Sequence, residues 1–566
     1  MVAETVRDEM LRQLGRYGEL LYSPAQNQLL LQVRQAGLLL ELADFLHDQR
    51  FYLVTVVAND ERELEDRRFK LYYMFSHPAA DLFVLAEYLL EPGAETYPSI
   101  HRQFAAVDCF EREIRDLLGL RPQDTREAAV EPGSWLHGSY PDRLHPLRRE
   151  HTTDELARRV AAHADGQSAP QADVARPRAG SLIMPVGPVH AGIIEPGQFL
   201  FTIAGEAIED LDIRLGYTHK GIERIFQSRL SLLDGWRLAE QVSGDSSFAH
   251  ALAYCRAAET LTDTRVPPAA ELLRGLFLEL ERIHNHVGDV AALAEDVALE
   301  WLSSELTVVR EQLLRLNKRV AGHRYLRRLN RPGGVALPAP LDGDHVRATL
   351  RACLARFGEL ARRMKGRAGF RDRTIGIGIL TREQALDLGV TGMAARACGI
   401  RRDCRWDHPT GLYGGAWLRA DPDPGWRAAE VTEAQAGDVY ARFLTRVEEV
   451  QSAHAIVEGV LDRWDAFSPE ERNRLLHEPH VLPENNYTFA VGYVEGFRGD
   501  VVYWLMQDKM NGIYRCKVRD PSMLNWPALR RSVLPGTVDG ARVETVLADF
   551  PLVNKSFNLS YSGNDL

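Results

Sequence analysis

Acidic, histidine and arginine side chains that could hold or pass protons stand at a few separate places along the chain. The candidates are Glu223, Asp245, His250 and Arg498. Carboxyl and imidazole groups exchange protons, and a neighbouring guanidinium favours the ionised carboxylate. Taken singly, each of these side chains is more often an ion-pair or helix-capping residue. A proton-handling role therefore requires that the fold gather them into one cavity.

A second set of side chains is rich in oxygen. Ser243, Asp245 and Ser246 are close in sequence, and Ser560 and Ser562 stand far later in the chain, so the five form one site only if the fold brings the two segments together. A hard cation such as magnesium prefers several charged oxygens, whereas this set contains one carboxylate. We therefore favour hydrogen-bonded hydroxyls over a magnesium site.

The cysteines show no pattern of a soft-metal site. No two of them have the two-residue spacing of zinc or iron–sulfur ligands, and we expect buried or reduced thiols and no cofactor held by this chain. The six are Cys109, Cys255, Cys353, Cys398, Cys404 and Cys516.

Length and composition limit the classes of protein. The chain has 566 residues, is 45% hydrophobic and 26% charged, and has a formal net charge of -11. At about 150 residues per domain it forms roughly two to four globular units. Its acidity argues against nucleic acid as a main partner, because phosphate binding needs a clustered basic surface. No run reaches the roughly 18 apolar residues that span a bilayer, so we expect a cytosolic or peripherally attached protein.

Residues 1–150 are predicted to form a small α+β domain. Residues 51–57 and 69–75 have the β-branched and aromatic content of strands, with a charged turn between them. Residues 80–90 suit either a strand or a helix, and the spacing over 99–118 predicts a helix with Glu111 and Glu113 off its apolar side.

Residues 151–180 are predicted to be a linker with one short helix, and 181–566 a second domain. The second domain opens with short strands and continues with helices whose apolar residues recur every three or four positions, which predicts a helical bundle. The strands are expected at 181–189, 198–203 and 207–215 and the helices around 276–290, 306–320, 344–366 and 433–465. Thr432 and Gln435 have the spacing of a capping box for the last helix.

Several motifs resemble one family. Residues 110–120 (FEREIRDLLGL) and 140–149 (YPDRLHPLRR) resemble the 30 kDa subunit of respiratory complex I, a docking module in that family. Motifs of the second domain resemble the complex I 49 kDa subunit and the large subunits of group 4 [NiFe]-hydrogenases, in family order. These are 185–190 (PVGPVH), 214–223 (RLGYTHKGIE), 279–286 (ELERIHNH), 495–500 (EGFRGD) and 519–526 (RDPSMLNW). The implied fold is α+β, with a small N-terminal α/β docking domain followed by a mainly helical-bundle, hydrogenase-large-subunit-like domain with small peripheral β-sheets.

The resemblance also marks where active hydrogenases hold nickel. Their four cysteine positions fall on Ser243, Ser246, Ser560 and Gly563 in this chain. Nickel in that site is bound by thiolates, a soft ligand that neither a hydroxyl nor a glycine can replace. We therefore expect no nickel–iron site and no hydrogen activation by this chain itself. The same alignment places Glu223, Asp245, His250 and Arg498 around the former metal position, together with His219 and Glu206.

A quinone site is the other role that the family implies. The histidine that contacts the quinone in complex I falls on Ile194, which cannot donate a proton, and no partnering tyrosine is evident at 241–245. Quinone chemistry of the familiar kind is therefore not expected.

The resemblance implies a large subunit of a membrane-bound hydrogenase-like or complex I-like, redox-driven ion-translocating complex. Without a nickel–iron site it would act in coupling and proton handling. Its implied partners are an iron–sulfur small subunit, a ferredoxin-like subunit and antiporter-like membrane subunits. The iron–sulfur clusters are expected in partner subunits, and the implied location of this chain is the cytoplasmic face of the cell membrane. Two alternatives stay open: a non-catalytic structural scaffold, and a quinone-reducing subunit of the NADH dehydrogenase type with NAD and quinone binding.

Overall fold

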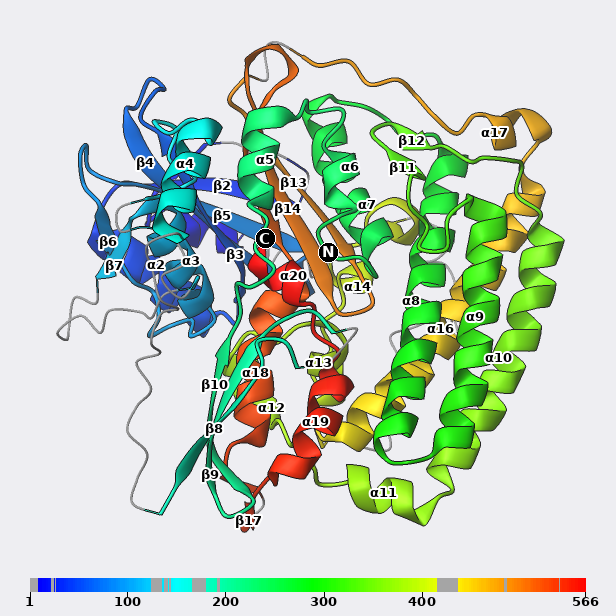
Figure 1. Cartoon of the computed structure of the whole chain (residues 1–566). Coiled ribbons are helices and arrows are strands. Elements are labelled where there is room, and N and C mark those ends of the chain that lie inside the picture. The colour runs from blue at the N-terminus through cyan, green and yellow to red at the C-terminus, as the bar shows by residue number, and fades with distance from the viewer. Residues whose placement is uncertain are drawn as a thin grey trace.

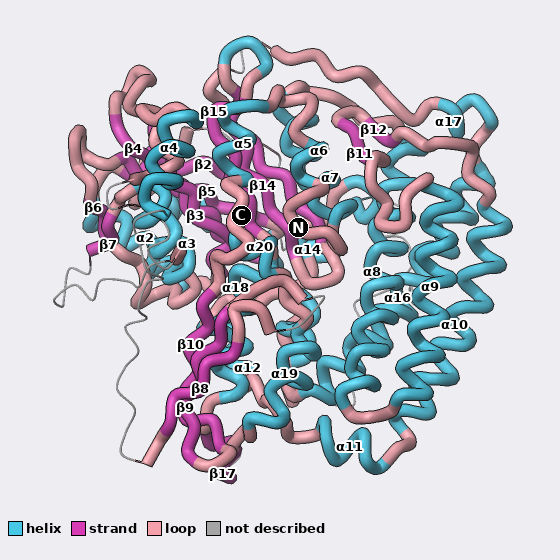
Figure 2. The backbone as a smooth tube through the Cα atoms, viewed as in Figure 1, coloured by secondary structure: helices cyan, strands magenta, loops and turns pink. Residues whose placement is uncertain are grey.

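The protein combines a strand-rich N-terminal region with a helical bundle, so the expected α+β class is confirmed. A computed structural model describes residues 9–21, 25, 27–123, 135–136, 141, 144–164, 180–190, 194–414, 436–482, 486–538 and 540–566. Figure 1 shows the N-terminal region in blue and cyan on one side, the bundle in green and yellow on the other, and the red C-terminal helices between them. The strands gather toward the N-terminal side (Figure 2).

The N-terminal region is built on a five-stranded sheet of order β1-β2-β5-β4-β3. β2 pairs parallel with β5, and β3, β4 and β5 are antiparallel neighbours. Its elements are β1 (Glu19–Leu20), β2 (Gln28–Val33), α2 (Ala36–Asp48), β3 (Tyr52–Glu61), β4 (Arg68–His77), β5 (Leu82–Leu89), β6 (Thr96–Pro98), α3 (Val107–Leu118) and β7 (Arg121–Gln123). The ambiguous segment at 80–90 is thus a strand, and α4 (Thr153–Ala164) is the short helix expected in the linker. The domain boundaries at 150 and 181 stay predictions.

Both faces of this sheet are buried, which explains the unbroken apolar runs of its strands. Leu71, Tyr73 and Phe75 of β4 pack into a core with α2 and α3. The alternate residues Tyr72 and Met74 pack against a second sheet, made of β13 (Phe489–Glu495), β14 (Asp500–Gln507) and β15 (Ile513–Arg519). The two sheets therefore join the N-terminal region to the far end of the chain.

The predicted bundle is present. α8 (Pro268–Asp296) packs against α9 (Glu300–Ala321) and α16 (Val439–Ala466), and α10 (Gly343–Lys365) packs on α9 and α16. The apolar stripes of α8 and α9 are buried as expected. Shorter elements fill the space between bundle and sheets.

The strands expected at the start of the second domain form an antiparallel three-stranded sheet of order β10-β9-β8. They are β8 (Leu182–Val186), β9 (Gln198–Ala204) and β10 (Ala207–Arg214). The other helices are α5 (Ile222–Arg229), α6 (Trp236–Ala239), α7 (Ser247–Leu261), α11 (Ala368–Thr374), α12 (Arg382–Asp387), α13 (Gly392–Ala397), α14 (Cys404–Asp407), α17 (Pro469–Asn473), α18 (Pro521–Val533), α19 (Phe550–Phe557) and α20 (Tyr561–Asp565). Two small strand pairs are β11 (Asn330–Arg331) with β12 (Gly334–Val335), and β16 (Gly536–Val538) with β17 (Ala541–Val543).

Two predicted helix boundaries were wrong. The helix expected over 99–118 begins only at Val107, because the preceding residues form turns, with the Phe104 amide bonded to the Ile100 carbonyl. The capping box at Thr432 and Gln435 lies outside the described residues. α16 begins instead at Val439, after Gly437 with a left-handed φ of 65°, and the Asp438 side chain caps it by accepting from the Ala441 amide at 2.7 Å.

Within the described ranges, no helix has both the length and the apolar character needed to cross a lipid bilayer.

Candidate functional site

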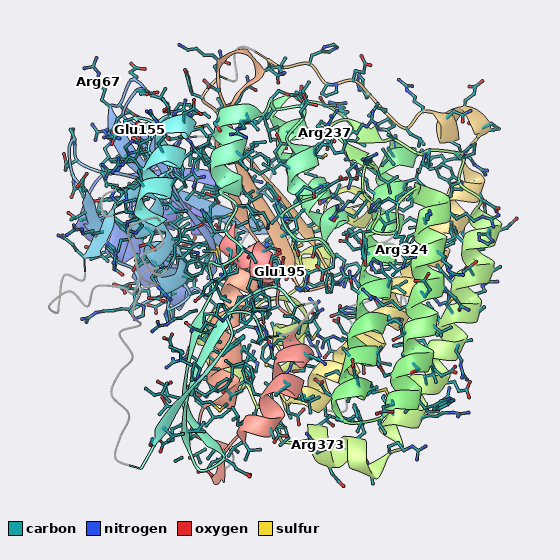
Figure 3. All side chains as sticks on the ribbon, in the orientation of Figure 1. Arg67, Glu155, Glu195, Arg237, Arg324 and Arg373 are labelled. Carbon is teal, nitrogen blue, oxygen red and sulfur yellow. The ribbon has the colours of Figure 1, made fainter. Side chains whose placement is uncertain are left out.

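A cavity of about 620 Å³ lies where the C-terminal segment meets the loop before α7 and the chain around the end of α9. Figure 3 labels Glu195, one of its lining residues, near the C-terminal segment in the centre of the molecule. Most of the residues that line the cavity have polar or charged side chains. Its lining includes Ile194, Glu195, Ser243, Gly244, Asp245, Arg310, His323, Tyr325, Arg327, Arg498, Asn554, Lys555, Asn558, Leu559, Ser560, Tyr561 and Ser562.

Of the four positions that the resemblance assigns to metal-binding cysteines, Ser243 and Ser560 line this cavity, and Ser246 and Gly563 contact its lining residues. Ser243 Oγ and Ser560 Oγ share a hydrogen bond of 2.9 Å. Ser560 Oγ also accepts from the Gly563 amide at 2.9 Å, which caps α20. Ser246 Oγ lies 3.3 Å from the Arg498 guanidinium. The structure thus brings these positions together, although Ser243 and Ser560 are 317 residues apart in the sequence.

These residues do not fit a soft metal ion. The hydroxyls are occupied by hydrogen bonds to one another, to the backbone and to Arg498, and a hydroxyl is a poor ligand for nickel. At Gly563 an added Cβ would lie 2.6 Å from Asp520 Cγ, so even a cysteine there would require Asp520 to move. Among the described residues, no group of three or more histidine, cysteine or carboxylate side chains could hold a metal ion.

Asp245 and Arg498 form the charged centre of the cavity. The guanidinium of Arg498 donates to both oxygens of Asp245, at 2.7 and 2.6 Å, in a bidentate pair. Ser243 Oγ donates to the same carboxylate at 3.0 Å. Burial opposes ionisation of Asp245, but the charge and hydrogen bonds of Arg498 outweigh it and lower the pKa to about 2. Asp245 is thus a fixed anion rather than a proton carrier at neutral pH.

His250 is completely buried behind this wall and does not line the cavity. Its Nε2 lies 3.0 Å from Asp520 Oδ2, and its Nδ1 lies 3.0 Å from the Tyr503 hydroxyl. Asp520 in turn packs against Gly563. His250 therefore reaches the cavity only through Asp520 and α20.

The prediction that Glu223 belongs to the same cavity was wrong. Glu223 is buried between the N-terminal region and the second sheet, where it accepts from Arg515 at 2.6 Å and lies 3.2 Å from Lys517. Lys517 also bonds Glu113 of α3, at 2.6 Å to each oxygen. Burial opposes ionisation of Glu223, but Arg515 and Lys517 outweigh it and lower its pKa. Glu223 thus helps to dock the two regions, and Glu113, expected on a solvated face, does the same.

The two remaining candidates also lie elsewhere. The ring of His219 bonds the Asp565 carbonyl at 2.6 Å, and the Asp565 side chain accepts from the Thr218 amide at 2.8 Å, which ties α20 to the loop before α5. Glu206 is exposed in the turn between β9 and β10. Ile194, which aligns with the quinone-contacting histidine of complex I, lines the cavity. Tyr561 lines it too, and its hydroxyl lies 3.4 Å from His190 Nε2.

Several lining residues were not among the sequence candidates. Arg310 comes from α9, and His323, Tyr325 and Arg327 come from the segment that follows it. The only sequence signal was the local concentration of basic residues over 323–328 (HRYLRR), which is equally typical of a solvated turn.

A chain of buried charged groups leads from the cavity into the bundle. Arg498 Nε donates to the Asn558 carbonyl, and Asn558 Nδ2 donates to Asp289 at 2.6 Å. Asp289 accepts from Arg446 at 2.9 Å and lies 4.0 Å from His286, whose Nε2 is 2.9 Å from Glu449. The first step runs through the backbone carbonyl of Asn558, and the later steps join ionisable or amide side chains in an interior of low dielectric.

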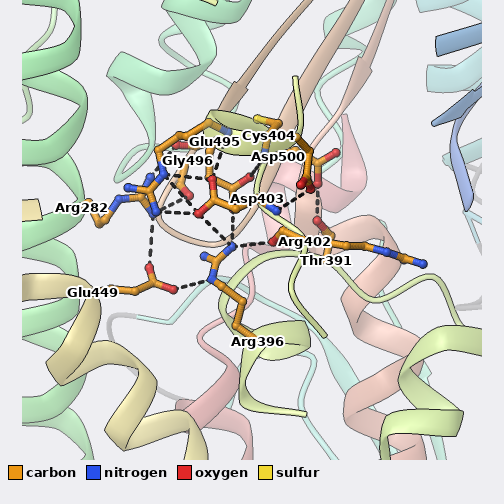
Figure 4. A network of polar contacts seen from close by, with 12 residues as sticks. Arg282, Thr391, Arg396, Arg402, Asp403, Cys404, Glu449, Glu495, Gly496 and Asp500 are labelled. Atoms are coloured by element: carbon orange, nitrogen blue, oxygen red, sulfur yellow. Dashed lines mark hydrogen bonds and ion pairs between the residues drawn. The ribbon is translucent and has the colours of Figure 1, made fainter. Parts of the chain in front are cut away.

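Glu449 connects this chain to a larger cluster (Figure 4). It accepts from Arg396 at 2.7 Å and from Arg282 at 3.3 Å. Arg396 also donates to Glu495 at 2.8 Å and lies 3.5 Å from Asp403. We call the whole set, from Asp245 to Asp403, the buried network.

Two buried carboxyl groups, Glu495 of the network and Glu281 of α8, have pKa values raised toward neutral pH or above it. Burial, with the nearby charge of Asp403, raises the pKa of Glu495 to about 7. Burial raises the pKa of Glu281 to about 8, although Glu281 accepts hydrogen bonds from the Phe248 and Ala249 amides at the start of α7. These groups, rather than Asp245, have the proton affinities of carriers.

Comparison with known proteins agrees with the domain order. Residues 303–559 match the model of the respiratory-chain NADH dehydrogenase 49 Kd subunit, and residues 32–156 match that of the 30 Kd subunit. Formate hydrogenlyase subunit 5 of Escherichia coli (strain K12) is 29% identical over 532 residues, which cover 93% of this chain and 87% of that protein. An NADH-quinone oxidoreductase subunit of Anaplasma marginale (strain St. Maries) is 27% identical, over 64% of this chain and 92% of that one.

A solved structure shows the same fold. A chain of the membrane-bound sulfane sulfur reductase, an archaeal respiratory membrane complex, superposes with a TM-score of 0.60 at 22% identity, over 69% of this chain and all of that chain. Together with the motifs, the two family models and the fused order, these matches show that the chain belongs to the family that unites the 30 kDa and 49 kDa subunits of respiratory-chain NADH dehydrogenase with hydrogenase large subunits.

Proposed function

We propose that this chain is a large subunit of a membrane-bound, redox-driven ion-translocating complex, and that it handles protons and couples redox change to transport instead of activating hydrogen. The relatives named above are subunits of formate hydrogenlyase, NADH-quinone oxidoreductase and a respiratory membrane complex. Their membership of such assemblies supports the first half of the proposal.

The buried network supports the second half. It links the cavity to the centre of the bundle through consecutive contacts, and it contains a carboxyl group whose pKa of about 7 allows it to gain and lose a proton under ordinary conditions. A change of charge or shape at the cavity would alter the Asp245–Arg498 pair first. That change would then reach Glu495 through Asn558, Asp289 and Glu449.

Partners follow from the proposed assembly. We expect an iron–sulfur small subunit beside the cavity, a ferredoxin-like subunit and antiporter-like membrane subunits, with the iron–sulfur clusters in those partners. The chain would lie on the cytoplasmic face of the membrane, attached through them.

The test compares two glutamates of the same helix in the complete complex. Glu449 of α16 is buried in the network, whereas Glu458 of α16 pairs with Arg347 and Arg351 at the surface. In membrane vesicles, Glu449→Gln should lower proton translocation by about tenfold or more. Glu458→Gln should leave it unchanged. Native electrophoresis checks that both variants assemble.

A scaffold predicts a different result. If Glu449→Gln assembles and translocates protons at the normal rate, the coupling role is wrong. A neighbouring small subunit without cluster cysteines would point the same way, because no electron could then reach the cavity.

A further inference from the structure

The cavity has two arginines whose charge no carboxylate neutralises. Arg310 and Arg327 both line it, and neither forms an ion pair with any described residue. Arg327 Nε donates only to Ser247 Oγ, at 3.1 Å. Arg310 Nε is buried and has no hydrogen-bond partner among the described residues. Arg310 and Arg327 are half-buried, and burying a guanidinium N–H without a partner is costly, so these arginines point to an anionic ligand that completes them.

The other cations of the cavity are different. Arg498 is neutralised by Asp245, and Lys555 donates to Asp296 at 2.6 Å. The acidic Glu195 accepts from the Ser562 amide at 3.0 Å. Glu195 therefore keeps its negative charge, and the unneutralised positive charge is confined to the wall formed by α9 and the segment after it.

The potential at this wall is positive. Burial, together with the charges of Arg327 and Arg328, lowers the pKa of His323, which lines the same wall. Glu240 feels the charge of Arg327, but burial raises the pKa of Glu240 to about 7, so it is only partly ionised at neutral pH. A positive, half-buried wall facing an open volume favours an anion.

The backbone leaves room for Arg310 in this position. Gly288 of α8 faces it, and a Cβ at Gly288 would lie 2.7 Å from Arg310 Nε. The missing side chain allows the guanidinium to lie between α8 and α9. An alanine at Gly288 would displace Arg310 without changing any charge.

We infer that the cavity binds a small ligand with a carboxylate or phosphate group, whose oxygens are held by Arg310 and Arg327. Guanidinium groups bind such oxyanions through paired N–H donors, which suits both arginines. Ser243, Ser560 and Ser562 are buried residues that line the same cavity, so the remainder of the ligand would lie against a polar surface. The inference does not depend on the coupling role, because it concerns binding by the chain alone.

The test measures binding to the purified full-length chain by calorimetric titration with inorganic phosphate and, separately, with acetate, at constant ionic strength set by chloride. We expect saturable binding of at least one anion, weakened about tenfold or more in Arg310→Gln and in Arg327→Gln. Arg315→Gln is the matched control, because Arg315 lies on α9 and pairs with Glu311 at the surface. The stronger of the two anions identifies phosphate or carboxylate as the recognised group.

A second measurement needs no variant. The bound anion should slow the modification of Arg310 and Arg327 by phenylglyoxal in the native chain, as read by peptide mass spectrometry, but not that of Arg315. Absence of both saturable binding and protection would overturn the inference. Equal affinity in folded Arg310→Gln, Arg327→Gln and native proteins would overturn it as well.

Discussion

At the scale of single residues, the chemistry of the cavity depends on small substitutions. A hydroxyl at 243 and 560 makes hydrogen bonds where a thiolate would bind a soft ion, and Arg498 has Asp245 as its partner. Position 563 has no room for a side chain, because Asp520 occupies the space where a Cβ would lie. These residues therefore form a polar site whose side chains hydrogen-bond to one another and to the backbone.

Gly563→Ala should destabilise the protein by about 1–3 kcal/mol, because the new Cβ forces Asp520 away from His250. Gly358→Ala in α10 is the control. Its Cβ meets no atom within 4 Å, so we expect a gain of about 0.5–1 kcal/mol from the better helix former. Urea unfolding monitored by circular dichroism measures both. If Gly563→Ala leaves the free energy of unfolding unchanged, α20 is not packed as described.

At the scale of elements, the start of α7 depends on a carboxyl group with a raised pKa. Glu281 of α8 accepts the Phe248 and Ala249 amides, at 2.7 and 3.0 Å. Its folded pKa of about 8 exceeds the ordinary value of 4.5, so the folded state binds a proton that the unfolded state has lost between those values. Stability from this group is therefore complete below about pH 4.5 and is lost as the pH rises toward 8.

Glu281→Gln should remove that dependence, since glutamine keeps an oxygen acceptor but cannot ionise. The native protein should lose stability relative to Glu281→Gln between pH 5 and pH 8, as measured by urea unfolding at several pH values. A difference that stays constant, or that grows as the pH falls, would contradict the assigned shift.

Local pattern was enough to predict the elements with regular apolar spacing. α9 and α10 could be found because one face of each is buried along its length, and α8, although it is buried on almost all sides, keeps apolar residues at every third or fourth position. The segment 80–90 could not be assigned, because β5 is buried on both faces and has no alternation. The start of α16 was missed because the left-handed backbone at Gly437 ends any earlier helix, which apolar spacing does not show.

At the scale of the whole molecule, the two sheets form one core. Trp504 of β14 is almost fully buried, its ring 4.8 Å from that of Phe489 and 4.9 Å from that of Tyr72 in the N-terminal sheet. Docking is completed by ion pairs such as Lys517 with Glu113. The N-terminal region is therefore part of the main body rather than a tethered module.

Trp504→Ala should cost about 3–5 kcal/mol, because it leaves a large cavity between the sheets. Trp301→Ala on the exposed side of α9 is the control and should change stability by less than about 0.5 kcal/mol. Thermal unfolding measures both. Limited proteolysis should also cut the N-terminal region faster in Trp504→Ala, and equal cutting rates in both variants would contradict a shared core.

The purified complex should contain no stoichiometric nickel in this chain, because the four ligand positions offer hydroxyls and a glycine. Elemental analysis by mass spectrometry checks this, with an active hydrogenase as the positive control. Nickel recovered at one equivalent, and lost on chelation together with hydrogen turnover, would refute the assignment.

The site was less predictable than the fold. The resemblance placed Ser243, Ser560, Asp245 and Arg498 in one cavity, because motif order fixes which segments meet. It misplaced Glu223, whose partners Arg515 and Lys517 lie almost 300 residues later and follow no local pattern. Arg310 was missed for the same reason, since an arginine on a helix indicates nothing until the space opposite it is known.

The contact between the two sheets also determines the order of assembly on the ribosome. The apolar face of the N-terminal sheet is complete once Leu89 has emerged, but the second sheet, which packs on it, begins only at Phe489. At roughly 5–20 residues per second, the wait is on the order of tens of seconds. A nascent chain would expose tyrosine, methionine and phenylalanine side chains throughout that time, so its yield in cells should depend on chaperones that shield them until translation ends.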